Sequence, residues 1–107
     1  MLEHGLNGLA LLDLQSGLDK GAVHVEALRQ AFPNTKLEVI PCDVTSEGEV
    51  QNAVQSARDT LGPLKILCCF AGVPLCVSAD DMTFEQWRRV TDVNLTGSWL
   101  AAQAVGR

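Results

Sequence analysis

The sequence predicts an α/β fold with a parallel sheet. Three short apolar segments have the composition of strands buried on both faces, Leu9–Leu14, Leu37–Cys42 and Lys65–Phe70. Segments with helical periodicity separate them. The order strand, helix, strand, helix, strand at this spacing is typical of parallel strands joined by right-handed crossovers.

The helices are predicted from the spacing of apolar residues and from their end signals. Between the first two strands, Ala22–Phe32 has apolar residues at steps of three and four, and Pro33 and Asn34 follow it. After the second strand, Thr45 and Ser46 precede a helix with acids in its first turn, which Gly62 and Pro63 close. Its apolar stripe consists of Val50, Ala53, Val54, Ala57 and Leu61. From Thr83 onward Phe84, Trp87 and Val90 begin another helical face, and Leu95–Val105 continues it.

Size and composition exclude several classes of protein. The 107 residues are enough for one domain, and the net charge of −5 offers no basic stripe for nucleic acid. No apolar run is long enough to cross a bilayer, and the first five residues contain no secretory leader, so a cytoplasmic location is expected. The four cysteines lack metal-binding spacing, so no metal site is predicted, and packing is favoured over redox chemistry for them.

Candidate binding residues follow the predicted strands, because ligands of open α/β sheets bind at the carboxyl ends of the strands. Asp13 ends the first strand, Asp43 and Val44 follow the second, and Ala71 and Gly72 follow the third. An acid at such an end can accept hydrogen bonds from the two hydroxyls of an adenosine ribose. Each acid is also a common turn former or helix cap, and Ala71-Gly72 is also a common turn, so both interpretations stay open.

Asn94 is the fourth candidate position, within the last helical stretch and just before Thr96 and Gly97. Taken singly, an asparagine in an apolar helix is better explained as a core residue whose amide bonds neighbouring carbonyls.

The ordered series L-L-D-L-Q, C-D-V-T-S, L-G-P-L-K-I-L-C-C-F-A-G-V and W-R-R-V-T-D-V-N-L-T-G-S-W resembles the short-chain dehydrogenase/reductase family. The resemblance runs from Leu2 to Arg107. It implies an NAD(P)-dependent oxidoreductase that acts on an alcohol or carbonyl substrate. It also implies roles for the candidate residues: Asp13 selects NAD over NADP, Asp43 and Val44 flank adenine, Ala71 and Gly72 line the cofactor cleft, and Asn94 corresponds to the catalytic asparagine.

The sequence also departs from the family pattern. The family's Asn-Asn-Ala-Gly motif is Cys69-Phe70-Ala71-Gly72, no glycine-rich phosphate loop occurs, and there is no tyrosine. We therefore expect residues 1–107 to form a partial NAD(P)-binding Rossmann domain, an incomplete doubly wound parallel sheet. It would lack the first strand with its glycine-rich loop and the C-terminal catalytic half. The missing strand would lie between Leu9–Leu14 and Lys65–Phe70. Cofactor binding is expected to be weak or absent, and catalysis absent in this chain alone.

Two other functions are considered. One is a non-catalytic remnant that associates with a full-length relative, or with itself, through the Leu95–Val105 helix. The apolar stripe of that helix, Leu95, Trp99, Ala102 and Val105, is equally explained as cover for the sheet. The other is a flavodoxin-like module, which is disfavoured because no acidic phosphoacceptor cluster or phosphate loop accompanies the strands.

Overall fold

A computed structural model of the chain describes residues 5–107. The four preceding residues, which belong to the stretch where no secretory leader was found, lie outside the described residues. The elements are β1 (Gly8–Asp13), α1 (Gln15–Ala31), β2 (Lys36–Pro41), α2 (Glu47–Leu61), α3 (Phe84–Thr91), a π-helical turn η2 (Asp92–Thr96) and α4 (Gly97–Gly106).

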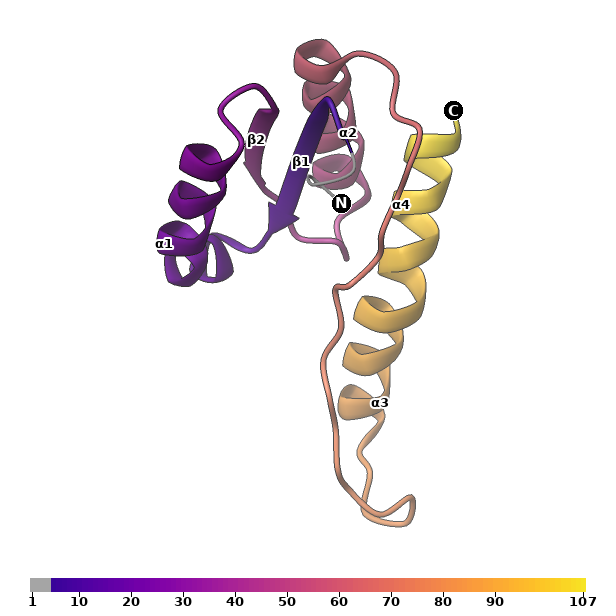
Figure 1. The fold of residues 1–107 in the computed structure, drawn as a ribbon. Coiled ribbons are helices and arrows are strands. Elements are labelled where there is room, and N and C mark those ends of the chain that lie inside the picture. Colours follow the sequence, from indigo (N-terminus) through magenta and orange to yellow (C-terminus); the bar gives the residue numbers. More distant parts are fainter. Residues whose placement is uncertain (1–4) are drawn as a thin grey trace.

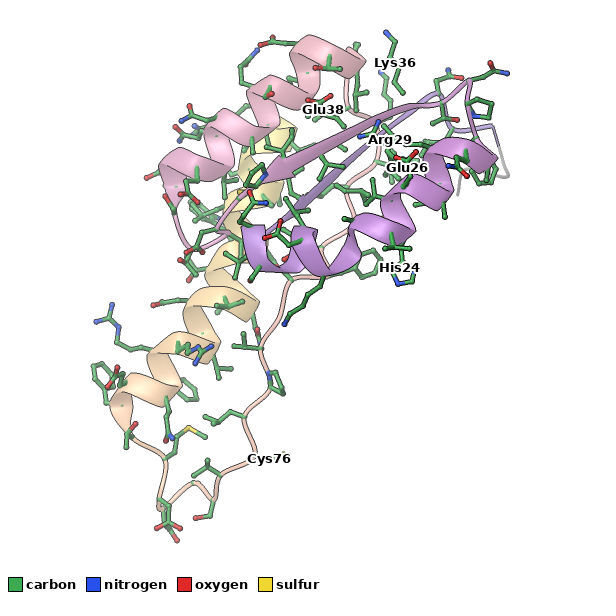
Figure 2. All side chains as sticks on the ribbon, turned by 90° about the vertical axis from the view of Figure 1, so that its left-hand side faces the viewer. His24, Glu26, Arg29, Lys36, Glu38 and Cys76 are labelled. Carbon is green, nitrogen blue, oxygen red and sulfur yellow. The ribbon has the colours of Figure 1, made fainter. Side chains whose placement is uncertain are left out.

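The two strands pair in parallel, as predicted, and α1 connects them (Figure 1). Their register runs from Gly8 opposite Lys36 to Asp13 opposite Pro41. Helices α1 and α2 lie on opposite faces of this sheet (Figure 2). Figure 2 also shows Arg29 reaching from α1 towards β2, where its guanidinium donates to the Leu37 carbonyl at 3.0 Å. The fold class expected from the sequence is therefore present, in partial form.

The prediction of a third strand at Lys65–Phe70 is wrong. This segment is part of a long extended connection that follows α2, and it makes no strand pairing within the described residues (Figure 1). Its apolar side chains are left exposed, Phe70 at 87% and Ile66 at 62%. An extended apolar segment becomes a strand only when a neighbouring strand satisfies its backbone groups, and β1 pairs only with β2 here.

The first helix is longer than predicted. It begins at Gln15, not at Ala22. The added segment contains two glycines and a single apolar residue, so neither helix propensity nor apolar periodicity indicates it in the sequence. None of its residues is fully buried. It therefore covers its face of the sheet loosely.

Helix α2 supplies the core and confirms its predicted ends and apolar stripe. Ser46 accepts a hydrogen bond from the Glu49 N–H, which caps the N-terminus. Gly62 ends the helix at φ 82°, a conformation that favours glycine. Buried side chains of α2 pack with Cys42 and with α4, and the core consists of Cys42, Val50, Ala53, Val54, Leu100 and Ala104.

The last helical stretch is confirmed with two corrections. Thr83 and Gln86 form a capping box at the start of α3. The helix then passes through the π turn of η2, so the predicted Leu95–Val105 helix includes two residues of irregular winding. The buried face of α4 consists of Gly97, Leu100 and Ala104, not of the predicted stripe.

Within that predicted stripe, only Val105 packs against the core cluster. Leu95 and Trp99 are 66% and 57% exposed, and Ala102 is exposed as well. The interpretation of this stripe as cover for the sheet is therefore wrong. Its other residues, Leu95, Trp99 and Ala102, are free for contacts outside the described chain.

The packing interpretation of the cysteines is confirmed only for Cys42, which is 3% exposed. Cys68, Cys69 and Cys76 are exposed, and Figure 2 shows Cys76 on the long connection, away from the sheet. The interpretation fails for Cys68 and Cys69 because it assumed a buried third strand. No helix of residues 5–107 combines the length and apolar character needed to cross a membrane.

Candidate functional site

The carboxyl end of β1 places Asp13 at the edge of the sheet. The Cys42 N–H donates to the Asp13 carbonyl at 2.8 Å, so the last residue of β1 is held beside the residue that follows β2. The Asp13 carboxylate is exposed, and its Oδ1 accepts a hydrogen bond from the Leu14 N–H at 2.7 Å. An acid therefore stands at this edge with its side chain accessible to a ligand.

Asp43 forms a tight turn between β2 and α2. Its Oδ1 accepts from both the N–H and the hydroxyl of Thr45, at 2.9 and 2.7 Å. These bonds from Thr45 lower the pKa of the Asp43 carboxyl. The turn-forming interpretation of Asp43 is confirmed by this geometry, and contact with adenine stays a prediction.

Glu49 holds the same turn from the first helical turn of α2. Its Oε2 accepts a hydrogen bond from the Asp43 N–H at 2.7 Å. The adjoining Cys42 is buried, and burial together with the carboxylates of Glu49 and Asp43 raises the pKa of its thiol. Two acids and a neutral thiol therefore surround the end of β2.

Val44 connects this turn to the last helix. A Cβ placed on Gly97 would lie 2.7 Å from the Val44 Cγ2, so the glycine lets the start of α4 approach the valine closely. Gly97 is buried by this contact. The residue predicted to flank adenine is therefore half-buried against α4.

Asn94 anchors the long connection to the helix. Its Oδ1 accepts from the Val73 N–H at 2.8 Å, and its Nδ2 donates to the Val73 carbonyl at 3.1 Å. A Cβ on Gly72 would lie 3.4 Å from the same Oδ1. Asn94 itself is exposed and lies in η2. The prediction of a core asparagine is therefore wrong, since Asn94 is exposed and its amide bonds the backbone of Val73, beyond the 65–70 segment.

These contacts bring the candidate residues to one edge of the molecule. Asp13 connects through Cys42 to Asp43 and Val44, Val44 touches the start of α4, and Asn94 one turn earlier touches Gly72. Ala71 precedes Gly72 on the exposed connection. The catalytic and cofactor-binding roles of these residues stay predictions.

A hollow of about 330 Å³ opens at this edge. Its lining residues are Leu14, Gln15, Pro41, Cys42, Asp43 and Glu49. Its size lies at the lower end of the range of ligand pockets, about 300–1,000 Å³. Of the candidate residues only Asp43 lines it, and Asp13 lies just before its Leu14 wall.

Two residues of the site were not singled out as site residues from the sequence. Glu49 had a signal, because Ser46 followed three residues later by Glu49 matches a capping box, although its carboxylate bonds the Asp43 N–H and not the N-cap N–H. The sequence signal for Gly97 was weaker. A glycine inside a helical pattern often marks close packing, but the partner, Val44, is distant in the sequence and could not be predicted.

The family model for short chain dehydrogenases matches residues 3–107 of this chain. Since the match covers nearly the whole sequence, the chain belongs to the short-chain dehydrogenase/reductase family of oxidoreductases, whose members bind NAD(P).

Individual relatives agree with this assignment. A short-chain dehydrogenase/reductase of Armillaria gallica is 37% identical over 65 residues, which are 61% of this chain and 25% of the relative. An uncharacterised oxidoreductase of Staphylococcus aureus strain USA300 is 35% identical over 68 residues, 64% of this chain and 29% of the relative. The solved structure of a putative short-chain dehydrogenase from Novosphingobium aromaticivorans superposes with a TM-score of 0.84 at 26% identity.

The superposition with the Novosphingobium protein covers 98% of this chain and 37% of the solved chain. The chain therefore spans between a quarter and two fifths of the length of these relatives. Its elements are arranged as in the larger fold.

Proposed function

We propose that this chain provides the adenosine-binding part of an NAD(P)-dependent oxidoreductase that acts on a small alcohol or carbonyl compound. The observation that carries the proposal is the convergence of Asp13, Asp43, Val44, Gly72 and Asn94 on one edge of the sheet, beside a hollow. The cytoplasmic location expected from the sequence stays a prediction.

The residues of this edge fit the adenosine half of the cofactor. The exposed carboxylate of Asp13 is an acceptor at the position where the two ribose hydroxyls are donors. A phosphate on the 2′-oxygen would bring negative charge towards this carboxylate and towards a chain whose net charge is −5. These charges support a preference for NAD over NADP.

The residues do not fit the pyrophosphate in the same way. A glycine-rich turn that leads into a helix N-terminus is the usual phosphate site of this fold, and the sequence contains none. Helix α1 begins at Gln15 after Leu14. Weak cofactor binding that depends on the adenosine contacts is therefore expected.

Titration of the 107-residue protein with NAD⁺ and NADP⁺ by calorimetry tests this proposal. Weak binding of NAD⁺ is expected, about tenfold weaker still in Asp13→Ala, with NADP⁺ weaker than NAD⁺ in the unmodified protein. Asp19→Ala is the matched control, because Asp19 lies in α1 and its carboxylate bonds Gln15 within the helix. Tight binding that Asp13→Ala leaves unchanged would contradict the assignment of the adenosine site.

We also propose that these residues alone do not catalyse the reaction. Hydride transfer to a carbonyl needs a general acid within hydrogen-bond reach of the reacting oxygen, and the family's tyrosine has no counterpart among these 107 residues. Incubation of the protein with NADH and a panel of ketones and aldehydes is expected to give no turnover. Turnover that an Asn94→Ala change abolishes would overturn this expectation.

The exposed apolar stripe favours a second candidate function, association with another chain. Leu95 in η2 and Trp99 in α4 are more than half exposed, and exposed large apolar side chains on one face are typical of interfaces. The partner is a second copy of this chain or a full-length relative. In that function the chain acts as a non-catalytic module.

Sedimentation tests this second function. The unmodified protein is expected to self-associate, and Trp99→Ala is expected to shift it towards monomer. Phe70→Ala is the matched control, because Phe70 is an exposed aromatic residue outside the helix. An unchanged Trp99→Ala protein, or an equal effect of both substitutions, would remove the helix face from the interface.

A further inference from the structure

The carboxylate of Asp13 occupies space that only a glycine at position 17 leaves open. A Cβ built on Gly17 would lie 2.6 Å from the Asp13 Cγ and 2.9 Å from its Oδ1, with Oδ2 closer still. Carbon atoms of real side chains do not approach other atoms this closely. The Asp13 carboxylate therefore lies against the first turn of α1, in the space that a side chain at position 17 would fill.

Two further features hold the carboxylate in this place. The Leu14 N–H donates to Oδ1 at 2.7 Å, which fixes one of the two carboxylate oxygens. The N-terminal end of α1 carries partial positive charge, and its first turn contains no acidic residue that would repel Asp13. The side chain is thus oriented before any ligand binds.

An oriented carboxylate matters for a ribose because two vicinal hydroxyls must meet two oxygens in one plane. A Cβ at position 17 can be accommodated cheaply, since the obstructing group is the end of a rotatable side chain. The cost of that accommodation falls on Asp13, which must turn to another rotamer and leave the Leu14 N–H. The change is expected to leave the fold intact but to impair the site, because Asp13 loses its orientation.

We propose that Gly17 is a positioning residue for Asp13, which sets the carboxylate in the orientation that receives the adenosine ribose of NAD. The inference rests on the proposed adenosine site. It adds a determinant of nucleotide selectivity that lies outside the strand ends and does not touch the ligand.

The experiment compares Gly17→Ala with Gly21→Ala. Both glycines lie in α1, but a Cβ on Gly21 meets nothing within 4 Å. Both substitutions replace the poorest helix former but proline with the best one, so both proteins are expected to be at least as stable as the unmodified chain. A loss of function confined to Gly17→Ala is therefore not a folding defect.

Two measurements are made on each protein. Calorimetric titration with NAD⁺ is expected to show about a tenfold loss for Gly17→Ala, similar to Asp13→Ala, because hydrogen bonds to a charged group are lost in both. No further loss is expected in the double variant, since both changes remove the same interaction. Gly21→Ala should bind as the unmodified protein does.

The second measurement needs no ligand. The temperature coefficient of the Leu14 amide proton, from heteronuclear NMR, reports whether that N–H remains hydrogen-bonded. Gly17→Ala is expected to change it to the value seen in Asp13→Ala, while Gly21→Ala keeps the original value. A Leu14 amide that is unchanged in Gly17→Ala would overturn the positioning role.

The two measurements also separate the inference from the proposed function. If the Leu14 amide responds as expected but the unmodified protein shows no NAD⁺ binding, the adenosine site is wrong and the positioning of Asp13 stands. If NAD⁺ binds and Gly17→Ala leaves its affinity equal or tighter, the inference is wrong and the adenosine site stands.

Discussion

Replacement of Gly97 by alanine tests the contact that joins the last helix to the site. Gly97 begins α4 with helical dihedral angles, φ −59° and ψ −44°, so alanine adopts its backbone conformation without strain. The new methyl group would lie 2.7 Å from the Val44 Cγ2 and 3.1 Å from the Val44 Cβ. The only consequence of the substitution besides helix propensity is therefore steric.

The size of the effect follows from two opposing contributions. Carbon atoms pack at about 3.5–4.0 Å, so the methyl group and Val44 must separate by about 1 Å. Valine is stiff at χ1 and cannot turn aside easily, and overpacking of this kind costs about 1–3 kcal/mol. Glycine to alanine in a helix interior gains about 1 kcal/mol. The net change is then a loss of about 0–2 kcal/mol.

Gly21→Ala isolates the steric contribution, because it gains the same helix propensity and its Cβ meets no atom. Urea unfolding followed by far-ultraviolet circular dichroism is the assay. The two alanine variants are expected to differ by about 1–3 kcal/mol, which is a midpoint about 1 M lower in urea for Gly97→Ala. In a Val44→Ala background the difference should shrink, since the Cγ2 at 2.7 Å is gone while the Cβ at 3.1 Å remains.

Equal stability of the two alanine variants would refute the close contact between α4 and Val44. A difference of the same size in the Val44→Ala background would place the obstruction elsewhere.

Three further predictions concern single groups. In native protein at pH 8 the three exposed cysteines are expected to react quickly with a thiol reagent, and Cys42 only on unfolding. Burial keeps the reagent from Cys42 and raises the pKa of the Cys42 thiol. Fast reaction of a fourth thiol would contradict this. Hydrogen bonds from Thr45 lower the pKa of Asp43 in the folded protein. Ionised Asp43 therefore stabilises the fold fully above the pKa that it has in the unfolded chain. This stabilisation is lost as pH falls through the pKa in the folded protein. The stability advantage over Asp43→Asn should shrink below about pH 4, and an advantage that grows in acid would refute it. Asn94→Ala should lower the free energy of unfolding in urea by about 1–2 kcal/mol, because two hydrogen bonds at an exposed position are lost. It should also speed hydrogen exchange at the Val73 amide, and unchanged exchange would show that Asn94 does not hold Val73.

Local sequence signals determined most of the secondary structure. The apolar runs that end at Asp13 and before Asp43 became paired strands, and the cap at Ser46 and the stop at Gly62 marked the ends of α2. These features depend on residues within a few positions of one another, so periodicity and capping chemistry are sufficient to predict them. The order of the motifs was sufficient for the family as well.

Tertiary contacts decided the features that depend on distant partners. Lys65–Phe70 has the composition of a strand but forms no strand within the described residues. A strand needs a hydrogen-bonded neighbour, which composition alone does not supply. The helical periodicity at the C-terminus indicated an apolar stripe, but only the packing against α2 and Val44 put Leu100 inside and Trp99 outside. The contact of Gly17 with Asp13 had no signal in the sequence, since a missing side chain acquires meaning only from the atoms that occupy its place.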